Sequence, residues 1–220
     1  MKHFVTFVRF SFLALFLFLI AKGKMMLWLG IFAVSLIAAI LFGRIYCGYI
    51  CPMNTLMIPT EWISKKLKIQ SVNTHSRSKH GKLPWITLFL SLDLMIIFKK
   101  ILHKDLPLLL IWLVIAVIIT LRYKPEVFHN QICPFGALQS TFGKFAKFSK
   151  GVNKEECIGC KLCEKVCPSE AIKVTTDNKK ATINTSLCHQ CSNCQQVCPK
   201  SAIHYTKTIK KEKVSSNSFS

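Results

Sequence analysis

Two runs of cysteines near the C-terminus constrain this chain more than any other feature of its sequence. Each run has the spacing Cys-x2-Cys-x2-Cys-x3-Cys-Pro. In this ligand pattern for [4Fe–4S] clusters, three thiolates come from one run and the fourth comes from the other. Disulfides or zinc sites do not account for two identical runs of four. The predicted ligands are Cys157, Cys160, Cys163 and Cys198 for one cluster, and Cys188, Cys191, Cys194 and Cys167 for the other.

The two cysteine runs are also copies of each other, at an offset of 31 residues. Between them, Ile172–Val174, a turn at 177–180 and Ala181–Ile183 predict a short β-hairpin. Over about residues 151–206 the sequence resembles the bacterial two-cluster ferredoxins. This resemblance implies a small α+β domain with two clusters close enough for fast electron transfer.

The chain before residue 140 has a different character. Hydrophobic residues make up 51% of the 220 residues, and they concentrate there in four runs, at 4–20, 25–42, 84–98 and 106–121. About 20 apolar residues span the hydrocarbon of a bilayer. Buried helices of a soluble domain are the alternative, but they would have to be apolar all round. The runs predict an α-helical membrane domain of four spans, although the third is short and contains Asp93.

The distribution of Lys and Arg predicts the orientation in the membrane. The stretch after the second run carries seven Lys and Arg residues, whereas the two opposite loops carry two and three. Cytoplasmic loops have this excess. We therefore expect a multi-pass protein of the inner membrane, with both termini and the cysteine runs in the cytoplasm. Free thiolate ligands also fit a reducing compartment.

Charge and composition set the expected partners and boundaries. The formal charge of +20 arises mostly beside the apolar runs, where Lys and Arg face lipid headgroups. Nucleic-acid binding is not expected, because no nucleic-acid fold signature accompanies the charge. The expected divisions are a transmembrane domain at 1–140, a linker at 141–150, a ferredoxin domain at 151–206 and a basic, disordered tail at 207–220.

A second repeat lies inside the apolar part, at an offset of 82 residues. Nearly the same offset superposes the first apolar run on the third and the second on the fourth. This predicts two repeated helical hairpins, related by an axis along the membrane normal, whose motifs can face each other. The aligned positions are Cys47, Cys51 and Pro52 in the first copy, and His129, Cys133 and Pro134 in the second.

These motifs, followed by the two cysteine runs, resemble the membrane-bound polyferredoxin family over most of residues 1–206. Its relatives include the quinol-dehydrogenase-type ferredoxin subunit of periplasmic nitrate reductase systems. Others act in the maturation of nitrous oxide reductase and cytochrome oxidase, and one of the latter reduces copper. The family pattern carries onto Cys47, Cys51 and Cys133. It departs at His129, where the usual pattern has a cysteine.

The chemistry of the second repeat has several candidate forms. Residues four apart share one face of an α-helix, so each pair can point at one ligand. Three sulfurs and one imidazole suit an iron–sulfur cluster, zinc or Cu(I). A Cys47–Cys51 disulfide, or simple packing of Cys47, Cys51, Cys133 and His129 where helices leave the bilayer, are open alternatives. Asp93 is the only acid in the four runs, and is a candidate proton acceptor for a quinone or an interfacial residue.

The expected function is single-electron relay by a membrane-anchored iron–sulfur protein, between a cytoplasmic redox partner and a membrane redox partner. One alternative is a quinol dehydrogenase subunit, which quinone-dependent cluster reduction would reveal. Another is a protein of metal (copper) reduction or metallocentre assembly, for which copper binding would depend on Cys51 and Cys133. The sequence has no flavin, haem or nucleotide motif. An electron-transfer subunit is therefore expected rather than a stand-alone enzyme, and no catalytic residue is assigned.

Overall fold

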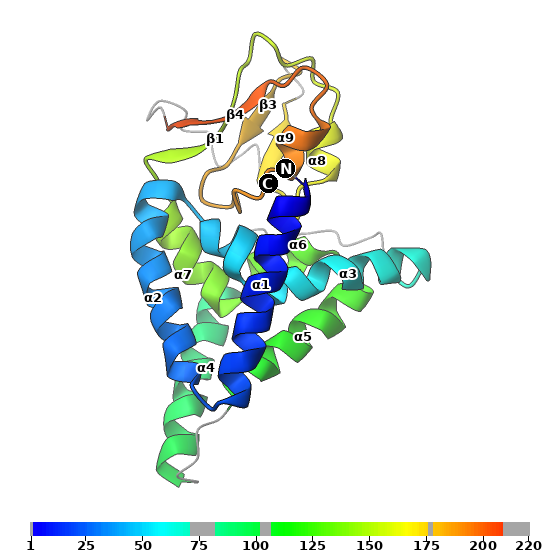
Figure 1. The fold of residues 1–220 in the computed structure, drawn as a ribbon. Coiled ribbons are helices and arrows are strands. Elements are labelled where there is room, and N and C mark those ends of the chain that lie inside the picture. Colours follow the sequence, from blue (N-terminus) through cyan, green and yellow to red (C-terminus); the bar gives the residue numbers. More distant parts are fainter. Residues whose placement is uncertain (1, 71–81, 102–106, 176–177, 209–220) are drawn as a thin grey trace. The chain divides into compact units, whose positions relative to one another are not determined.

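The computed structural model describes residues 2–70, 82–101, 107–175 and 178–208 (Figure 1). The chain divides into two compact units. The helical unit comprises Met1–Ile31 and Tyr49–Ala137, and the cysteine-rich unit comprises Phe32–Gly48 and Leu138–Ser220.

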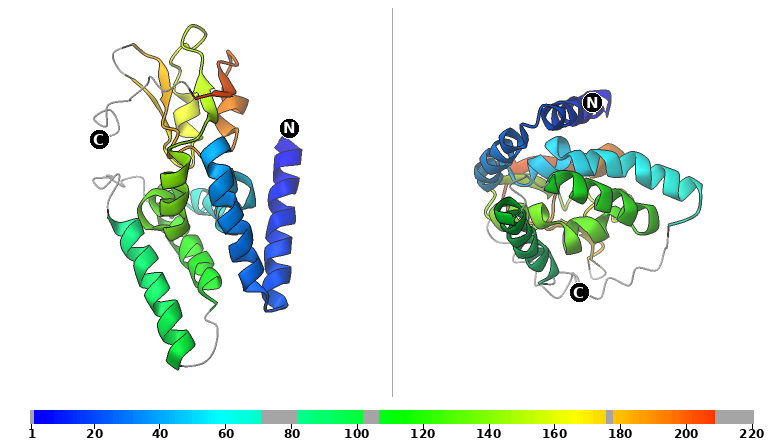
Figure 2. Two further views of the ribbon diagram at one scale, coloured as in Figure 1. Left: turned by 90° about the vertical axis from the view of Figure 1, so that its left-hand side faces the viewer. Right: turned by 90° about the horizontal axis from the view of Figure 1, so that it is seen from below.

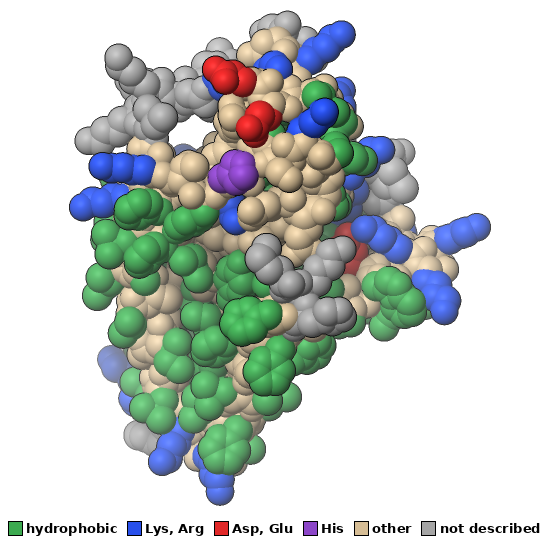
Figure 3. Space-filling view, turned by 45° about the horizontal axis from the view of Figure 1, so that its top comes forward, with side chains coloured by type: hydrophobic (Ala, Val, Ile, Leu, Met, Phe, Trp, Pro, Cys, Tyr) green, Lys and Arg blue, Asp and Glu red, His purple; other side chains and the backbone are tan. Residues whose placement is uncertain are grey.

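The first two apolar runs form long helices, α1 (Lys2–Ala21) and α2 (Met25–Phe42), joined by a turn at Gly23. Both helices are long and apolar enough to cross a membrane, and only 11% and 17% of the residues in their apolar windows are buried. On the face shown in Figure 3, hydrophobic side chains cover the helical part of the chain. Such all-round apolar surfaces are expected of helices that lipid surrounds.

The third and fourth runs are helical too, as α4 (Leu83–Ile101) and α5 (Leu108–Arg122). α4 contains Asp93 and ends in Lys99 and Lys100, which lower its apolar character. α5 has 15 residues, which gives a length of about 22 Å. The hydrocarbon core is about 30 Å thick. Spanning by these two helices therefore stays a prediction.

Short polar contacts hold α4 and α5 in the helical unit. Trp112 on α5 donates its indole N–H to the Ser91 hydroxyl of α4, at 3.1 Å. Helix α3 (Pro52–Lys66) lies along α5, as Figures 1 and 2 show, and the Ser64 hydroxyl donates to the Leu121 carbonyl at 2.6 Å. The other elements of the repeat are η1 (Tyr46–Ile50), α6 (Pro125–Val127), η2 (Phe128–Ile132) and α7 (Pro134–Gly143).

The cysteine-rich unit is built on two small antiparallel sheets. β2 (Ile172–Val174) pairs with β3 (Ala181–Ile183), so the predicted hairpin strands are confirmed. Residue 177, the first of the predicted turn, lies outside the described residues. β1 (Phe148–Val152) pairs with β4 (Ile203–Lys207), and β1 begins inside the stretch expected to be a linker. Helices α8 (Leu162–Lys165) and α9 (Asn193–Val197) each follow the start of one cysteine run.

Candidate iron–sulfur sites

The first cavity of interest in the cysteine-rich unit has four cysteines in its wall. Three come from the first cysteine run and the fourth comes from the end of the second. The remaining wall is mostly apolar and includes Val152, Val174 and Ile203. The structure thus brings together the set that the spacing predicts for the first cluster, which is Cys157, Cys160, Cys163 and Cys198.

The second cavity has the reciprocal composition. Three cysteines of the second run line it with one cysteine of the first, and Ala171, Ile172 and Ile183 cover them. His189 also lines this cavity, and its side chain is fully buried. The cysteines are Cys188, Cys191, Cys194 and Cys167, which is the set predicted for the second cluster.

The backbone explains why each run curls around its cavity. Six residues with left-handed φ angles occur in three pairs, and the two members of each pair are 31 positions apart. Such turns reverse the chain within a few residues and let successive cysteines face inward. The structural repeat therefore reproduces the sequence repeat. The pairs are Gly159 with Gln190, Lys161 with Ser192, and Glu170 with Ser201.

Backbone N–H groups point at several of the cysteine sulfurs. The Ala171 amide donates to Cys167 Sγ at 3.2 Å, and the Ala202 amide donates to Cys198 Sγ at 3.4 Å. Hydrogen bonds to ligand sulfurs are one of the means by which proteins tune cluster potentials. These two bonds serve the two crossover cysteines, so they occupy equivalent places in the two halves.

Burial makes the cysteine thiols hard to ionise on their own. It raises the pKa of Cys163 to about 11 and the pKa of Cys194 to about 12, and it raises the pKa of Cys188 as well. A metal ligand must nevertheless be a thiolate. A positively charged iron core would supply the missing stabilisation, and soft thiolates are its preferred ligands. The donor set therefore fits [4Fe–4S] clusters.

A single metal ion does not fit the same cysteines. Among the described residues, no group of three or more His, Cys, Asp or Glu side chains is close enough to hold one ion. A single zinc ion would require sulfurs at about 2.3 Å from one centre. A cubane has an iron at each of four corners, so its ligand sulfurs stand farther apart. The arrangement favours a polynuclear centre over zinc.

The glycine of the first cluster loop supplies a test of this geometry. Gly159 has φ +69°, and a Cβ there would overlap the Lys179 carbonyl oxygen. We expect Gly159→Ala to lower the thermal midpoint by several degrees, because left-handed φ alone costs about 1–2 kcal/mol. Each kcal/mol corresponds to roughly 2–4 °C in a chain of this size. Thermal loss of the visible cluster absorbance measures the effect.

The matched control for this substitution is Gly23→Ala. Gly23 has a similar φ of +67°, but nothing lies within 4 Å of its Cβ position. The control therefore carries the backbone cost without the steric overlap, and it lies far from the cysteine runs in sequence. Equal losses of thermal stability in the two variants would show that the close contact between the Lys179 carbonyl and Gly159 does not contribute to stability.

The 82-residue repeat is reproduced in the backbone of the second pair of motifs. A π-turn, η1 or η2, precedes Cys51 and Cys133 in the respective copies, and a helix then begins at the following proline. Cys51 has φ −65° and ψ 118°, and Cys133 has φ −64° and ψ 113°. The residues four apart in each motif are therefore joined by a π-turn and not by an α-helix. That each pair points at one ligand stays a prediction.

All four residues of these motifs are buried. Their exposed fractions range from 4% for His129 to 7% for Cys51. Cys133 Sγ accepts a hydrogen bond from the Gly136 amide at 3.4 Å, in the first turn of α7. The Cys47 thiol is 3.7 Å from Arg44 Nη2. Cys47 belongs to the cysteine-rich unit, whereas Cys51, His129 and Cys133 belong to the helical unit.

Asp93 and Arg44 are two charged residues that lie in different surroundings. Asp93 lies on α4 with an exposed side chain, and its role in proton or quinone binding stays a prediction. Arg44 is one of the seven Lys and Arg residues after the second apolar run, where a solvated charge is expected, but its side chain is 1% exposed. Its position directly before a Cys-x3-Cys-Pro motif was the only sequence signal that could have drawn attention to it.

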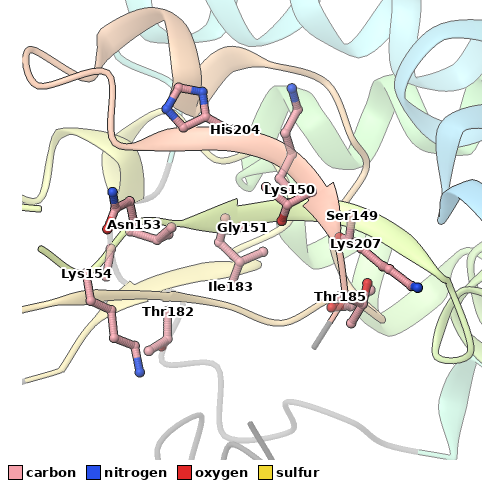
Figure 4. A pocket seen from close by; sticks show the side chains of 14 residues that line it. Ser149, Lys150, Gly151, Asn153, Lys154, Thr182, Ile183, Thr185, His204 and Lys207 are labelled. Carbon is pink, nitrogen blue, oxygen red and sulfur yellow. The ribbon is translucent and has the colours of Figure 1, made fainter. Parts of the chain in front are cut away.

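A third cavity, of about 500 Å³, lies between β1, β3 and β4 (Figure 4). No sequence motif indicated it. Its lining includes hydroxyl-bearing side chains, His204 and three lysines, which are Lys150, Lys154 and Lys207. The Lys150 ammonium group donates to Gln195 Oε1 at 2.7 Å. The cavity contains none of the cysteines.

Two protein families match the chain, and together they cover both parts. The family described as a 4Fe-4S binding domain matches residues 25–70 and 105–153, which include the Cys-x3-Cys-Pro motif and its second copy. The family described as a 4Fe-4S dicluster domain matches residues 156–202. Iron–sulfur clusters are therefore the indicated cofactors.

Two of the relatives are ferredoxin-type proteins, and they indicate the family of the chain. The chain is 25% identical over 158 residues to the methylamine utilization ferredoxin-type protein MauN of Methylobacillus flagellatus, covering 65% of this chain and 54% of MauN. It is 23% identical over 159 residues to the ferredoxin-type protein NapH of Haemophilus influenzae, covering 66% of this chain and 54% of NapH. The matched domains and these relatives support a NapH-like polyferredoxin family for the chain. The chain thus has iron–sulfur binding domains and is related to the ferredoxin-type proteins MauN and NapH.

A further relative is the uncharacterized protein MJ0749 of Methanocaldococcus jannaschii. The polyferredoxin is 30% identical to it over 144 residues, which cover 64% of this chain and 58% of MJ0749. The matched region thus spans little more than half the length of MJ0749, MauN and NapH. No solved structure matches the chain.

Proposed function

We propose that this polyferredoxin relays single electrons between a cytoplasmic redox partner and a redox partner in the inner membrane. The observation that carries the proposal is the pair of cavities, each lined by four cysteines drawn from both runs. When bound there, [4Fe–4S] clusters supply reversible one-electron chemistry. The protein contributes the thiolates, the apolar cover and the N–H donors to sulfur.

The two cysteine sets differ in solvent exposure, and this difference supports electron relay between partners rather than storage of electrons. The first set lies near the surface, since Cys160 is exposed and its neighbours Ile158 and Leu162 are 57% and 41% exposed. The second set is enclosed, with Cys188 and Cys191 both buried. A surface-near centre suits exchange with a separate protein, and an enclosed centre suits transfer within the chain.

Helices α1 and α2 support the membrane anchor. We expect sodium carbonate to leave the full chain in the membrane fraction, because their apolar side chains would otherwise face water. Reporter fusions after Lys68 and at the C-terminus should report the cytoplasm, and fusions near Gly23 and Lys104 should report the opposite side. If only the fusion near Lys104 reports the cytoplasm, α4 and α5 do not both cross the membrane.

Release of the chain into the carbonate supernatant would contradict anchoring by α1 and α2. A C-terminal reporter that is active outside the cytoplasm would contradict the orientation. The matched control is a chain with Lys65 and Lys66 changed to Gln. Its loop then carries fewer positive charges, so a mixed orientation in this variant would show that Lys and Arg set the topology.

We also propose a further iron–sulfur centre at the second pair of motifs. The specific support is the 4Fe-4S binding family, whose match includes both copies. The proposed ligands are Cys47, Cys51, Cys133 and His129. Three thiolates and an imidazole are an acceptable ligand set, as His also replaces Cys in some clusters. All four side chains are buried, which agrees with a ligand role.

A further inference from the structure

Arg44 is a buried charge inside the cysteine-rich unit. Its side chain is 1% exposed, and its guanidinium contacts the segment that leads into the second cysteine run. Nη1 donates to the carbonyl oxygens of Ser186 and Leu187, at 3.4 and 3.5 Å. Leu187 directly precedes Cys188, the first ligand of the second set. The charge therefore lies beside the second cysteine set.

Neither ion pair found among the described residues, Lys65–Glu61 or Lys124–Glu126, involves the Arg44 guanidinium. Its bonds to carbonyl oxygens are long, and Nε has no hydrogen-bond partner. A buried, unpaired charge is costly, so buried charges are normally matched by an opposite charge. A [4Fe–4S] cluster with four thiolate ligands is an anion. The second cluster would supply counter-charge on the side of Ser186 and Leu187, and Cys47 Sγ, 3.7 Å from Nη2, would supply it as a thiolate ligand of the proposed further centre.

The packing holds Arg44 in this place from two sides. A Cβ at Gly143 would lie 3.0 Å from Arg44 Cγ, so the end of α7 fits closely against the side chain. A Cβ at Gly48 would overlap the His189 carbonyl oxygen, so the segment after Arg44 touches the loop between Cys188 and Cys191. This close packing agrees with the burial of the Arg44 side chain.

Among the described residues, the cations beside the first cysteine set are not buried. Lys200 lines its cavity and is exposed, and Lys180 Nζ donates to the Cys157 carbonyl oxygen at 2.6 Å. Lys180 is only partly buried, so solvent and salt screen its charge. A charge of the same sign acts far more strongly when it is buried, because the effective dielectric constant is lower.

We propose that Arg44 is the positioning residue that gives the second cluster the higher reduction potential of the pair. One-electron reduction adds one negative charge to a cluster, and the buried guanidinium stabilises the reduced form. This inference rests on the proposed function, since it requires two bound clusters. It adds an energetic asymmetry that the cysteine spacing alone does not contain.

The test is a redox titration of the full-length protein, with dithionite as the reductant and electron paramagnetic resonance as the readout. A Cys167→Ser variant identifies the signal of the second cluster. We expect Arg44→Gln to lower the reduction equilibrium constant of that cluster about tenfold. For a one-electron couple this corresponds to about 59 mV. The first cluster should shift much less.

Arg44→Lys and Lys180→Gln are the matched variants. Arg44→Lys keeps the charge, so the second cluster should keep its potential, whereas Lys180→Gln should shift only the first cluster, and weakly. Equal shifts in Arg44→Lys and Arg44→Gln, or unchanged potentials in Arg44→Gln, would overturn the proposal. If the Arg44→Gln variant does not bind the second cluster, the Arg44→Lys variant tests the proposal by itself. A wild-type potential of the second cluster in Arg44→Lys supports the role of the charge. Failure of Arg44→Lys to bind this cluster contradicts it.

The unmodified protein separates this inference from the proposed function. If it contains two [4Fe–4S] clusters and Arg44→Gln has no effect, only the role of Arg44 is wrong. If the unmodified protein lacks two clusters, the proposed function itself is wrong, and this is known before any variant is compared.

Discussion

Cys167→Ser removes the second cluster and leaves the first, with loss of about four of the eight iron atoms that two cubanes contain. The physical reason is the crossover of ligands. Cys167 belongs to the first run in sequence, but it lines the cavity of Cys188, Cys191 and Cys194. Serine is a poor replacement for a soft thiolate at an iron ligand. Iron and acid-labile sulfide per chain, measured anaerobically, give the result.

Double variants distinguish ligand crossover from two runs that each bind their own cluster. Cys167→Ser combined with Cys191→Ser alters one cavity twice, so about half of the iron of the two ferredoxin clusters should remain. Cys167→Ser combined with Cys160→Ser alters both cavities, so nearly all of the iron of these two clusters should be lost. The opposite pattern would show that each run binds its own cluster without crossover.

We expect the replacement of Cys51 and Cys133 by Ala to remove the proposed further iron–sulfur centre and to leave both ferredoxin clusters. The two cysteines occupy equivalent places after π-turns, and the 4Fe-4S binding family covers both. The iron content should fall below that of the unmodified chain, while the signals of the two ferredoxin clusters persist. His129→Cys should keep the centre and lower its potential, because a thiolate donates more negative charge than an imidazole.

Thr60→Ala is the control for this pair. Thr60 is a buried residue of α3, and its hydroxyl bonds only to the Leu56 carbonyl of its own helix. The control should keep the full metal content. Unchanged iron content in the Cys51 and Cys133 variants would assign these cysteines to packing alone.

The parts of the fold that local sequence determines were predicted well. The spacing of the cysteines fixed which of them share a cavity, because short gaps leave a loop few ways to turn. The strands Ile172–Val174 and Ala181–Ile183 and the helix Met25–Phe42 have the predicted bounds. Each of these rests on a strong period or spacing within a few residues.

Features that depend on distant partners could not be predicted in the same way. Arg44 is buried by contacts with Ser186 and Leu187, more than 140 positions away, whereas an Arg beside an apolar run is ordinarily a loop charge. β1 starts inside the expected linker because Phe148 pairs with Lys207. The π-turns before Cys51 and Cys133 have no period that separates them from an α-helix.

The central claim is that residues 157–198 hold two [4Fe–4S] clusters, and an iron and sulfide count tests it most directly. The count is made anaerobically on the full chain with Cys51 and Cys133 replaced by Ala, alongside the unmodified chain, whose content must be at least as high. In the variant, only the two ferredoxin runs retain their complete cysteine sets. The account predicts about eight iron and eight sulfide atoms per chain. About four or fewer of each in fully loaded protein would contradict it.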